Sequence, residues 1–216
     1  METLVSFQLE SSVLSLDEIL DKMDQRGESL RSMSATIVQR KWTDILEEFD
    51  QGERGKLHFL KEKKKIYLRK DITDPVKSTL LINDGKVVVY QPRIEQARRY
   101  DLGQRKDRAE FLLLGFISDR DALQEAYSIR LLGKENIDHG EAYALELTPR
   151  STQLSAYFSK IVLWIDWELW VPIQQRLVEP TGDYLLFQFK DVQLNIRMQS
   201  SRFELKLPPN VQVLQF

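Results

Sequence analysis

The chain contains no cysteine and only two histidines among its 216 residues. The absence of cysteine excludes disulfide bonds, zinc sites built from thiolates and thiol nucleophiles. His58 and His139 stand far apart and no HExxH spacing is present, so we expect no metal site. The sequence also lacks a G-x-S-x-G elbow, a P-loop and a G-x-G-x-x-G motif. We therefore expect a protein that is not an enzyme and has no cofactor.

The chain also lacks a strong net charge and a long apolar run. Its formal net charge is −2 and its pI about 5.8, which argues against a nucleic-acid-binding protein. No apolar run approaches the roughly 20 residues that span a bilayer, so we do not expect an integral membrane protein. The first seven residues lack a basic region followed by an apolar one, so we predict no signal peptide in the chain. Two locations stay open: the cytoplasm, or a secreted mature form.

Charge is unevenly distributed along the chain. Residues 54–108 hold 16 Lys and Arg against 7 Asp and Glu, a balance of +9. One interpretation is a solvated strand end and turn. The other is a rim that binds an acidic partner or lipid headgroups. The residues expected to form this rim are Lys61, Lys63, Lys64 and Lys65.

A single helix is predicted near the start of the chain. Residues 15–18 read Ser-Leu-Asp-Glu, a capping box in which the Ser15 hydroxyl and the Glu18 carboxylate each bind backbone N–H groups. Apolar residues then recur at helical spacing, which predicts an amphipathic helix from about 16 to 31, weakened near Gly27.

Most of the remaining sequence has the pattern of β-strands. Leu80–Ile82 and Val87–Tyr90 flank an Asp-Gly turn and form the clearest hairpin. Roughly eleven such strands follow one another without alternating helices, which predicts a meandering antiparallel sheet. With 42% hydrophobic residues and no linker, residues 1–216 are expected to form one domain.

One segment interrupts the β pattern. Arg108–Phe116 is predicted to be a helix with Asp107 as a plausible N-cap, and we expect a helical region over about 107–126. Its five large apolar residues exceed what one helix face can hold, so we expect it to act as a packed helix or a lid.

Three motifs, in this order, resemble the outer-membrane lipoprotein carrier family, which is called LolA-like. The first is Leu81–Pro92 followed by Glu-Gln-Ala, a hairpin with a DGK turn and an aromatic-ended second strand. The second is Tyr143–Arg150, a strand that ends in Thr-Pro-Arg, and the third is the closing segment Phe203–Val213. With the amphipathic helix ahead of them, these motifs cover nearly the whole chain.

The resemblance implies a mainly β (α+β) fold: an open, strongly curved half-barrel whose concave apolar face is covered by helices. It also implies a periplasmic, non-catalytic carrier, a monomer, that binds acyl chains of lipoproteins or phospholipids. An inner-membrane transporter and an outer-membrane receptor are the implied partners. The alternative is an envelope-stress sensor or protein-interaction module on the same scaffold.

Strand parity and the predicted lid helix, which supplies Leu113 and Phe116, indicate the side chains that line the cavity, on the assumption that one face of each strand points inward. The expected lining residues are Leu57, Phe59, Ile82, Val88, Tyr90, Leu113, Phe116, Phe187 and Phe189. Lys61 is the nearest candidate for the arginine that latches the lid in relatives, and lysine lacks the guanidinium fork. We therefore expect lid closure to depend mainly on apolar contacts.

Overall fold

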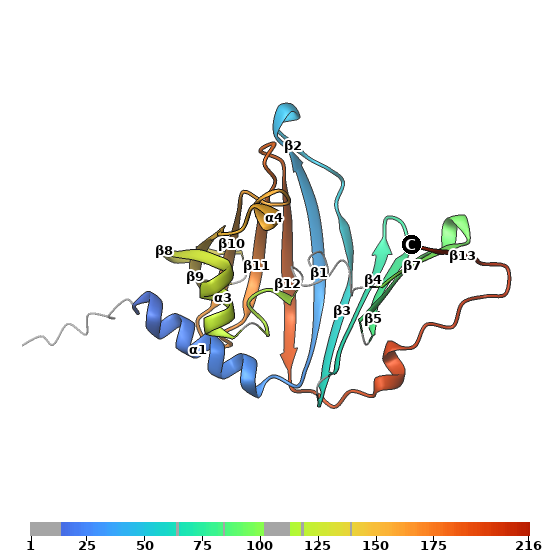
Figure 1. Ribbon diagram of the computed structural model, residues 1–216, viewed down its shortest axis with the longest axis horizontal. Helices are drawn as coiled ribbons and strands as arrows, with labels where there is room; N and C mark the ends of the chain where they lie inside the picture. The colour runs from blue at the N-terminus through green and yellow to red at the C-terminus, as the bar shows by residue number, and fades with distance from the viewer. Residues whose placement is uncertain (1–13, 64, 84, 102–112, 118, 139) are drawn as a thin grey trace, which may run out of the picture.

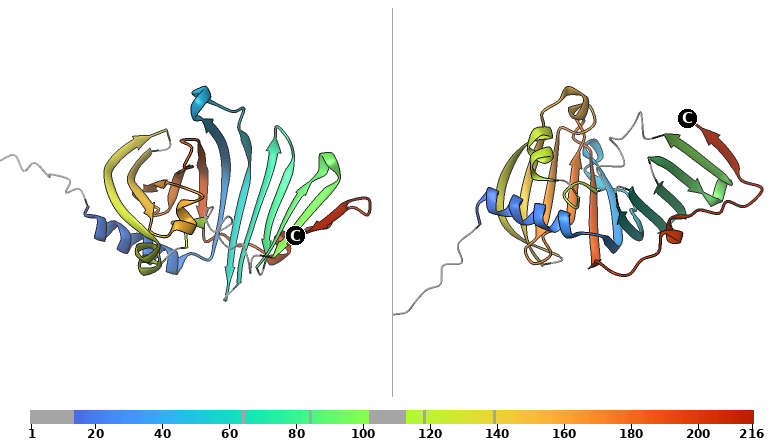
Figure 2. Two further views of the ribbon diagram at one scale, coloured as in Figure 1. Left: turned by 45° about the horizontal axis from the view of Figure 1, so that its top comes forward. Right: turned by 60° about the horizontal axis from the view of Figure 1, so that its bottom comes forward.

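One strongly curved, open β-sheet with helices over its concave face makes up most of the protein (Figures 1 and 2). The computed structural model describes residues 14–216 except 64, 84, 102–112, 118 and 139. These residues form a 13-stranded sheet, which confirms the predicted fold class. The expected number of strands was two too low because β2 (Glu48–Phe49) and β13 (Gln212–Gln215) are too short to give a clear pattern.

The chain enters the sheet in its middle rather than at an edge. β1 (Ser32–Thr43) pairs with β3 (Glu53–Glu62) on one side and β12 (Tyr184–Leu194) on the other. From β3 the chain moves outward by antiparallel pairing through β4 (Lys65–Asp74), β5 (Ser78–Asn83), β6 (Lys86–Gln91) and β7 (Gln96–Asp101).

The second half of the chain builds the sheet from its other edge inward. The strands concerned are β8 (Tyr127–Ile137), β9 (Gly140–Pro149), β10 (Lys160–Asp166) and β11 (Pro172–Val178), which leads into β12. The pairing of β1 with β12 joins the two halves. The sheet is therefore not a simple meander, because the first long strand lies at its centre.

Three helices and three short 3₁₀ turns accompany the sheet in the described residues. The helices are α1 (Leu16–Ser29), α3 (Arg120–Ala126) and α4 (Thr152–Ser155). The turns are η1 (Asp44–Leu46), η2 (Pro92–Ile94) and η5 (Ser200–Phe203).

Helix α1 begins as the sequence predicts. The Ser15 hydroxyl accepts from the Glu18 N–H at 3.3 Å and the Ser15 N–H donates to the Glu18 carboxylate at 2.8 Å, which completes the capping box. The helix ends at Ser29, and Gly27 lies buried inside it without interrupting it.

The main hydrophobic core lies between α1 and the concave face of the sheet. Ile19, Leu20 and Met23 of α1 are buried against side chains that alternate along the strands. The sheet contributes to this core from both halves of the chain, with Leu57, Phe59, Leu68, Ile82, Leu145, Leu163, Phe187 and Phe189 among its members.

The convex face is covered in part by the C-terminal segment. After β12, residues 195–211 cross the outside of the sheet, and Phe203 is buried against Leu60 and Leu81. The segment then adds β13 alongside β7, in parallel orientation. Strands β3–β6 therefore have apolar contacts on both faces.

The described end of the predicted helix Arg108–Phe116, residues 113–116, is not α-helical. Residues 102–112, with the proposed N-cap Asp107, lie outside the described part of the chain. Residues 113–117 form a tight turn in which Gly115 adopts φ +81°. A Cβ at Gly115 would lie 2.8 Å from Pro172 and 3.0 Å from Leu163, so the turn packs directly on β10 and β11. Among the described residues of this region, α3, capped by Asp119, is α-helical, and Leu113 has 3₁₀ geometry.

Candidate functional site

A cavity of about 880 Å³ opens on the concave face, at the end of the sheet that carries α4 and the β11–β12 turn. This volume falls within the range of roughly 300–1,000 Å³ typical of ligand pockets. One wall is apolar and comes from the β11–β12 hairpin and the segment after α4, with Phe158, Leu177, Leu185 and Phe187. The cavity is large enough for part of an acyl chain.

The lining of the cavity is also partly polar. It includes Gln39 of β1, which pairs across the sheet with Phe187, Lys70 of β4 and Glu179 of the β11–β12 turn. The Lys70 ammonium donates a hydrogen bond to Gln39 Oε1 at 3.0 Å. Burial lowers the pKa of Lys70 below its usual value, and the nearby Glu53 carboxylate only partly opposes this shift. The cavity is therefore amphipathic.

The sequence placed most of the expected lining residues on the correct face. Seven of the nine belong to the single buried cluster on the concave side: Leu57, Phe59, Ile82, Leu113, Phe116, Phe187 and Phe189. Of these, Phe187 lines the cavity of about 880 Å³. Phe116 packs edge-on against Phe189 with ring centroids 5.1 Å apart. Contact of these residues with an acyl chain stays a prediction.

The expected inward parity of β6 is wrong. Val88 packs against the convex cluster of Leu60, Leu81 and Phe203, and Tyr90 shares its face by strand alternation. Val87 and Val89 point to the concave core instead. The run Val87–Tyr90 does not alternate between apolar and polar residues, so it does not indicate which face points inward. The reason is that the C-terminal segment makes the convex face apolar as well.

The expected lysine rim does not lie at this cavity. Lys61, Lys63 and Lys65 belong to the β3–β4 hairpin end, which lies beside the start of β1, whereas the cavity lies toward the end of β1. Lys63 and Lys65 are exposed, and Lys64 is outside the described residues. Binding of a partner or headgroups by these lysines stays a prediction.

The helices that cover the concave face are joined by an arginine that the sequence analysis missed. The guanidinium of Arg120, at the start of α3, forms ion pairs with Asp17 and Asp21 of α1. The backbone N–H of Arg120 also donates to the Asp24 carboxylate at 3.1 Å. These contacts raise the pKa of Arg120, chiefly through the hydrogen bond to Asp21. Ion pairs therefore add to the apolar contacts on which closure was expected mainly to depend.

A buried glutamine anchors the turn at 113–117 to the sheet. Gln175 of β11 is fully buried, and its Nε2 donates to the Leu114 carbonyl at 2.9 Å. Because this hydrogen bond is buried and joins residues 61 positions apart, it ties the turn to β11. Leu113 and Phe116 are thus held as core residues in this conformation.

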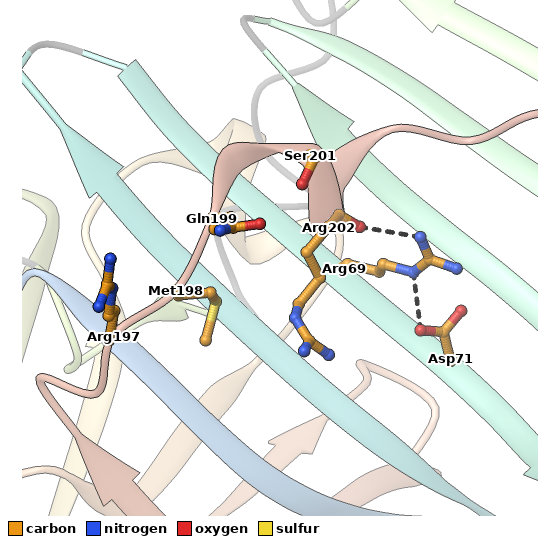
Figure 3. A pocket seen from close by; sticks show the side chains of 7 residues that line it. All are labelled: Arg69, Asp71, Arg197, Met198, Gln199, Ser201 and Arg202. Atoms are coloured by element: carbon orange, nitrogen blue, oxygen red, sulfur yellow. Dashed lines mark hydrogen bonds and ion pairs between the residues drawn. The ribbon is translucent and has the colours of Figure 1, made fainter.

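A second hollow of about 590 Å³ lies on the convex face, beneath the C-terminal segment (Figure 3). It is rich in arginine, with Arg69, Arg197 and Arg202 among its lining residues. Arg69 pairs with Asp71 at 2.7 Å and donates to the backbone carbonyls of Arg202 and Glu204. These bonds tie the segment to β4, so we assign Arg69 a structural role.

His58 lies at the edge of the same contact. Its Nε2 is 3.2 Å from an Arg202 guanidinium nitrogen, while its buried Nδ1 has no hydrogen-bond partner within the described part of the chain. Burial, followed by the positive charge of Arg202, lowers the pKa of His58 below 6.5. His58 is therefore held neutral against the C-terminal segment.

Two other classes of feature are absent from the described residues. Outside the gaps at 1–13, 64, 84, 102–112, 118 and 139, no group of three or more His, Asp or Glu is arranged to hold a metal ion. Within the same described residues, no helix has the length and apolar character needed to cross a membrane.

Comparison with protein families gives one match that covers most of the chain. The model of the outer membrane lipoprotein carrier protein LolA matches residues 28–206. An outer-membrane lipoprotein carrier protein of Chromohalobacter salexigens is 25% identical over 145 residues, 67% of this chain and 64% of that protein. An uncharacterized protein of Methanocaldococcus jannaschii is 23% identical over 204 residues, 93% of this chain. The chain spans only 54% of that protein.

Solved structures share the fold at low sequence identity. An uncharacterized conserved protein from Thermus thermophilus has a TM-score of 0.61 and 14% identity, over 94% of this chain and 100% of the other. The MucA/MucB complex of Pseudomonas aeruginosa has a TM-score of 0.54 and 17% identity, over 91% of this chain and 63% of the other.

The arginine between α1 and α3 leads to a first prediction. Arg120→Met removes both ion pairs, so the amides of α1 should exchange their hydrogens about two- to fivefold faster. Hydrogen exchange measured by mass spectrometry checks this. Arg130→Met, which breaks the ion pair with Glu146 on the sheet, is the matched control and should leave α1 unchanged. Unaltered α1 exchange in Arg120→Met would show that apolar packing alone holds the helix.

A second prediction concerns acid stability. Because the pKa of His58 is lowered in the folded state, the unfolded chain takes up a proton at higher pH than the folded chain does. The part of the stability that is present above pH 6.5 is therefore lost as the pH falls through the pKa of His58 in the folded protein. His58→Gln should show a smaller drop in melting temperature between about pH 7.5 and about pH 5. An equal drop in melting temperature in both proteins would contradict a lowered pKa of His58 in the folded state.

Proposed function

The chain belongs to the family of the outer membrane lipoprotein carrier protein LolA, and from this premise we propose that it is a non-catalytic carrier of acyl chains. The observation that carries the proposal is the cavity of about 880 Å³ on the concave face, with its apolar wall of Leu177, Leu185 and Phe187. The cargo is the acyl part of a lipoprotein or another lipid.

Hydrophobic burial alone is sufficient for this kind of binding. Each methylene that leaves water contributes about 0.8 kcal/mol, so a partly buried acyl chain binds reversibly without any catalytic group. Release then requires a change in the covering elements or a partner that accepts the chain. The ion pairs of Arg120 with α1 and the bond from Gln175 to Leu114 are the contacts such a change would break.

The proposal includes a location and partners, which rest on the family alone. A carrier of this family works in the periplasm, takes its cargo from an inner-membrane transporter and delivers it to an outer-membrane receptor. The exposed lysines of the β3–β4 hairpin, Lys63 and Lys65, are candidates for contact with such a partner. They lie at the other end of the sheet from the cavity, so a partner could bind there while the cavity is occupied.

A protein-binding module on the same scaffold is the alternative. The MucA/MucB complex is an example of a protein of similar fold bound to another protein, although the likeness concerns the fold alone. A module of this kind needs no acyl ligand. Its function should not depend on the free volume of the cavity.

Filling the cavity tests the proposal. Leu185→Trp places a larger side chain in the apolar wall, so the dissociation constant of a fluorescent fatty-acid analogue should rise about tenfold or more. Leu186→Trp makes the same change one residue along β12, on the opposite face, and is the matched control. It should bind the probe as the unaltered protein does. Equal probe binding by both variants, with circular dichroism unchanged, would exclude this cavity as the acyl site.

A further inference from the structure

Lys70 occupies a position where the sheet otherwise carries apolar residues. Leu68, Lys70 and Ile72 alternate along β4 and share one face, and both Leu68 and Ile72 are buried in the concave core. The opposite face of β4 carries Arg69 and Asp71, which hold the C-terminal segment. Lys70 is therefore a cation on the apolar, ligand-binding side of the sheet.

The ammonium of Lys70 is only partly compensated by its surroundings. Gln39 Oε1 accepts one hydrogen bond at 3.0 Å, and an ammonium can donate three. Glu53 is near enough to favour the charged form, but within the described parts of the chain no carboxylate lies at ion-pair distance from Lys70. Glu179 lines the same cavity, but its carboxylate forms an ion pair with the Lys41 ammonium at 3.9 Å and not with Lys70.

An ammonium in this position lowers the stability of the protein unless a ligand compensates its charge. Lys70 is half-buried, and a partly buried ammonium without an ion pair loses hydration that a methionine in the same space would not need. Lys70 lines the cavity, so a ligand in this space would lie beside its side chain. The apolar side chains of Leu177, Leu185 and Phe187 line the same cavity, and Phe187 pairs across the sheet with Gln39.

We propose that Lys70, assisted by Gln39, binds the anionic headgroup of a single-chain amphiphile whose acyl chain lies against Leu177, Leu185 and Phe187. The recognised group is a carboxylate or a phosphate monoester, since both offer oxygen acceptors to an ammonium. This inference rests on the proposed function, because it assigns the polar end of the same acyl site. It makes the protein selective for charge at the head of its ligand rather than for chain length alone.

Three ligands with the same chain test the inference on the unaltered protein: dodecanoate, dodecyl phosphate and dodecanol. Dissociation constants are measured by displacement of a neutral fluorescent acyl probe. A charge-assisted hydrogen bond predicts that at least one of the two anions binds about tenfold or more tightly than dodecanol. The comparison between the two anions shows whether a carboxylate or a phosphate is preferred.

Two lysine variants assign the preference to Lys70. Lys70→Met should bind dodecanol as before and lose the preference for the anions, whereas Lys70→Arg should keep much of it. Lys56→Met is the matched control, because Lys56 lies on the adjacent strand β3 but is exposed on the opposite face. It removes the same charge and should keep the full preference.

Each outcome of this experiment is decisive. Equal binding of all three ligands by the unaltered protein would overturn the role of Lys70 and leave the carrier proposal standing. An anion preference that persists in Lys70→Met would also overturn it. If none of the three ligands displaces the probe and the probe itself does not bind, the carrier proposal fails together with this inference. The comparison on the unaltered protein stays valid even if Lys70→Met does not fold.

Discussion

Curvature without closure is the constraint on which the remaining structure depends. The edge strands β8 and β13 belong to opposite ends of one sheet, and the strands between them bend around a concave apolar face. A sheet of this shape cannot fill its own interior. Helix α1, the turn at 113–117 and α3 cover part of that face, and a cavity of about 880 Å³ lies near the end that they leave uncovered.

Two kinds of interaction keep this arrangement in place. Apolar contacts of Ile19, Leu20 and Met23 attach α1 to the sheet, and burial of this kind contributes the larger part of the stability. Polar contacts then define the position of each covering element: Arg120 joins α3 to α1, and Gln175 holds the turn at 113–117. Because an ion pair at the surface is weak, the contacts of Arg120 with α1 can be exchanged without unfolding the sheet, whereas the Gln175 hydrogen bond is buried.

Local signals predicted most of the fold correctly, and long-range contacts account for the errors. The capping box at Ser15 and the hairpin of β5 and β6 depend on neighbouring residues only, and both are present. The wrong parity of Val88 has a distant cause, since Phe203 covers the convex face. The dense apolar run before Ile117 was interpreted as a helix, although at residues 113–117 it is a buried turn around Gly115.

The candidate site was predicted less completely than the fold. Seven of the nine expected residues lie in the concave core, but Lys70, which lines the cavity, was counted only in the charge of residues 54–108. A signal was available, because Lys70 falls between Leu68 and Ile72 on one face of a strand. The pairing of Arg120 with Asp17 and Asp21 could not be foreseen, since about a hundred residues separate the partners.

The central claim is that the concave cavity holds an acyl chain in the native protein. Its most direct test is mass spectrometry of organic extracts from the full chain, purified from its own cells without detergent. The account predicts a lipid with at least one acyl chain, in an amount close to that of the protein. An extract with no such lipid above the level of an unrelated protein purified in parallel, from a chain that also fails to take up added lipid, would contradict it.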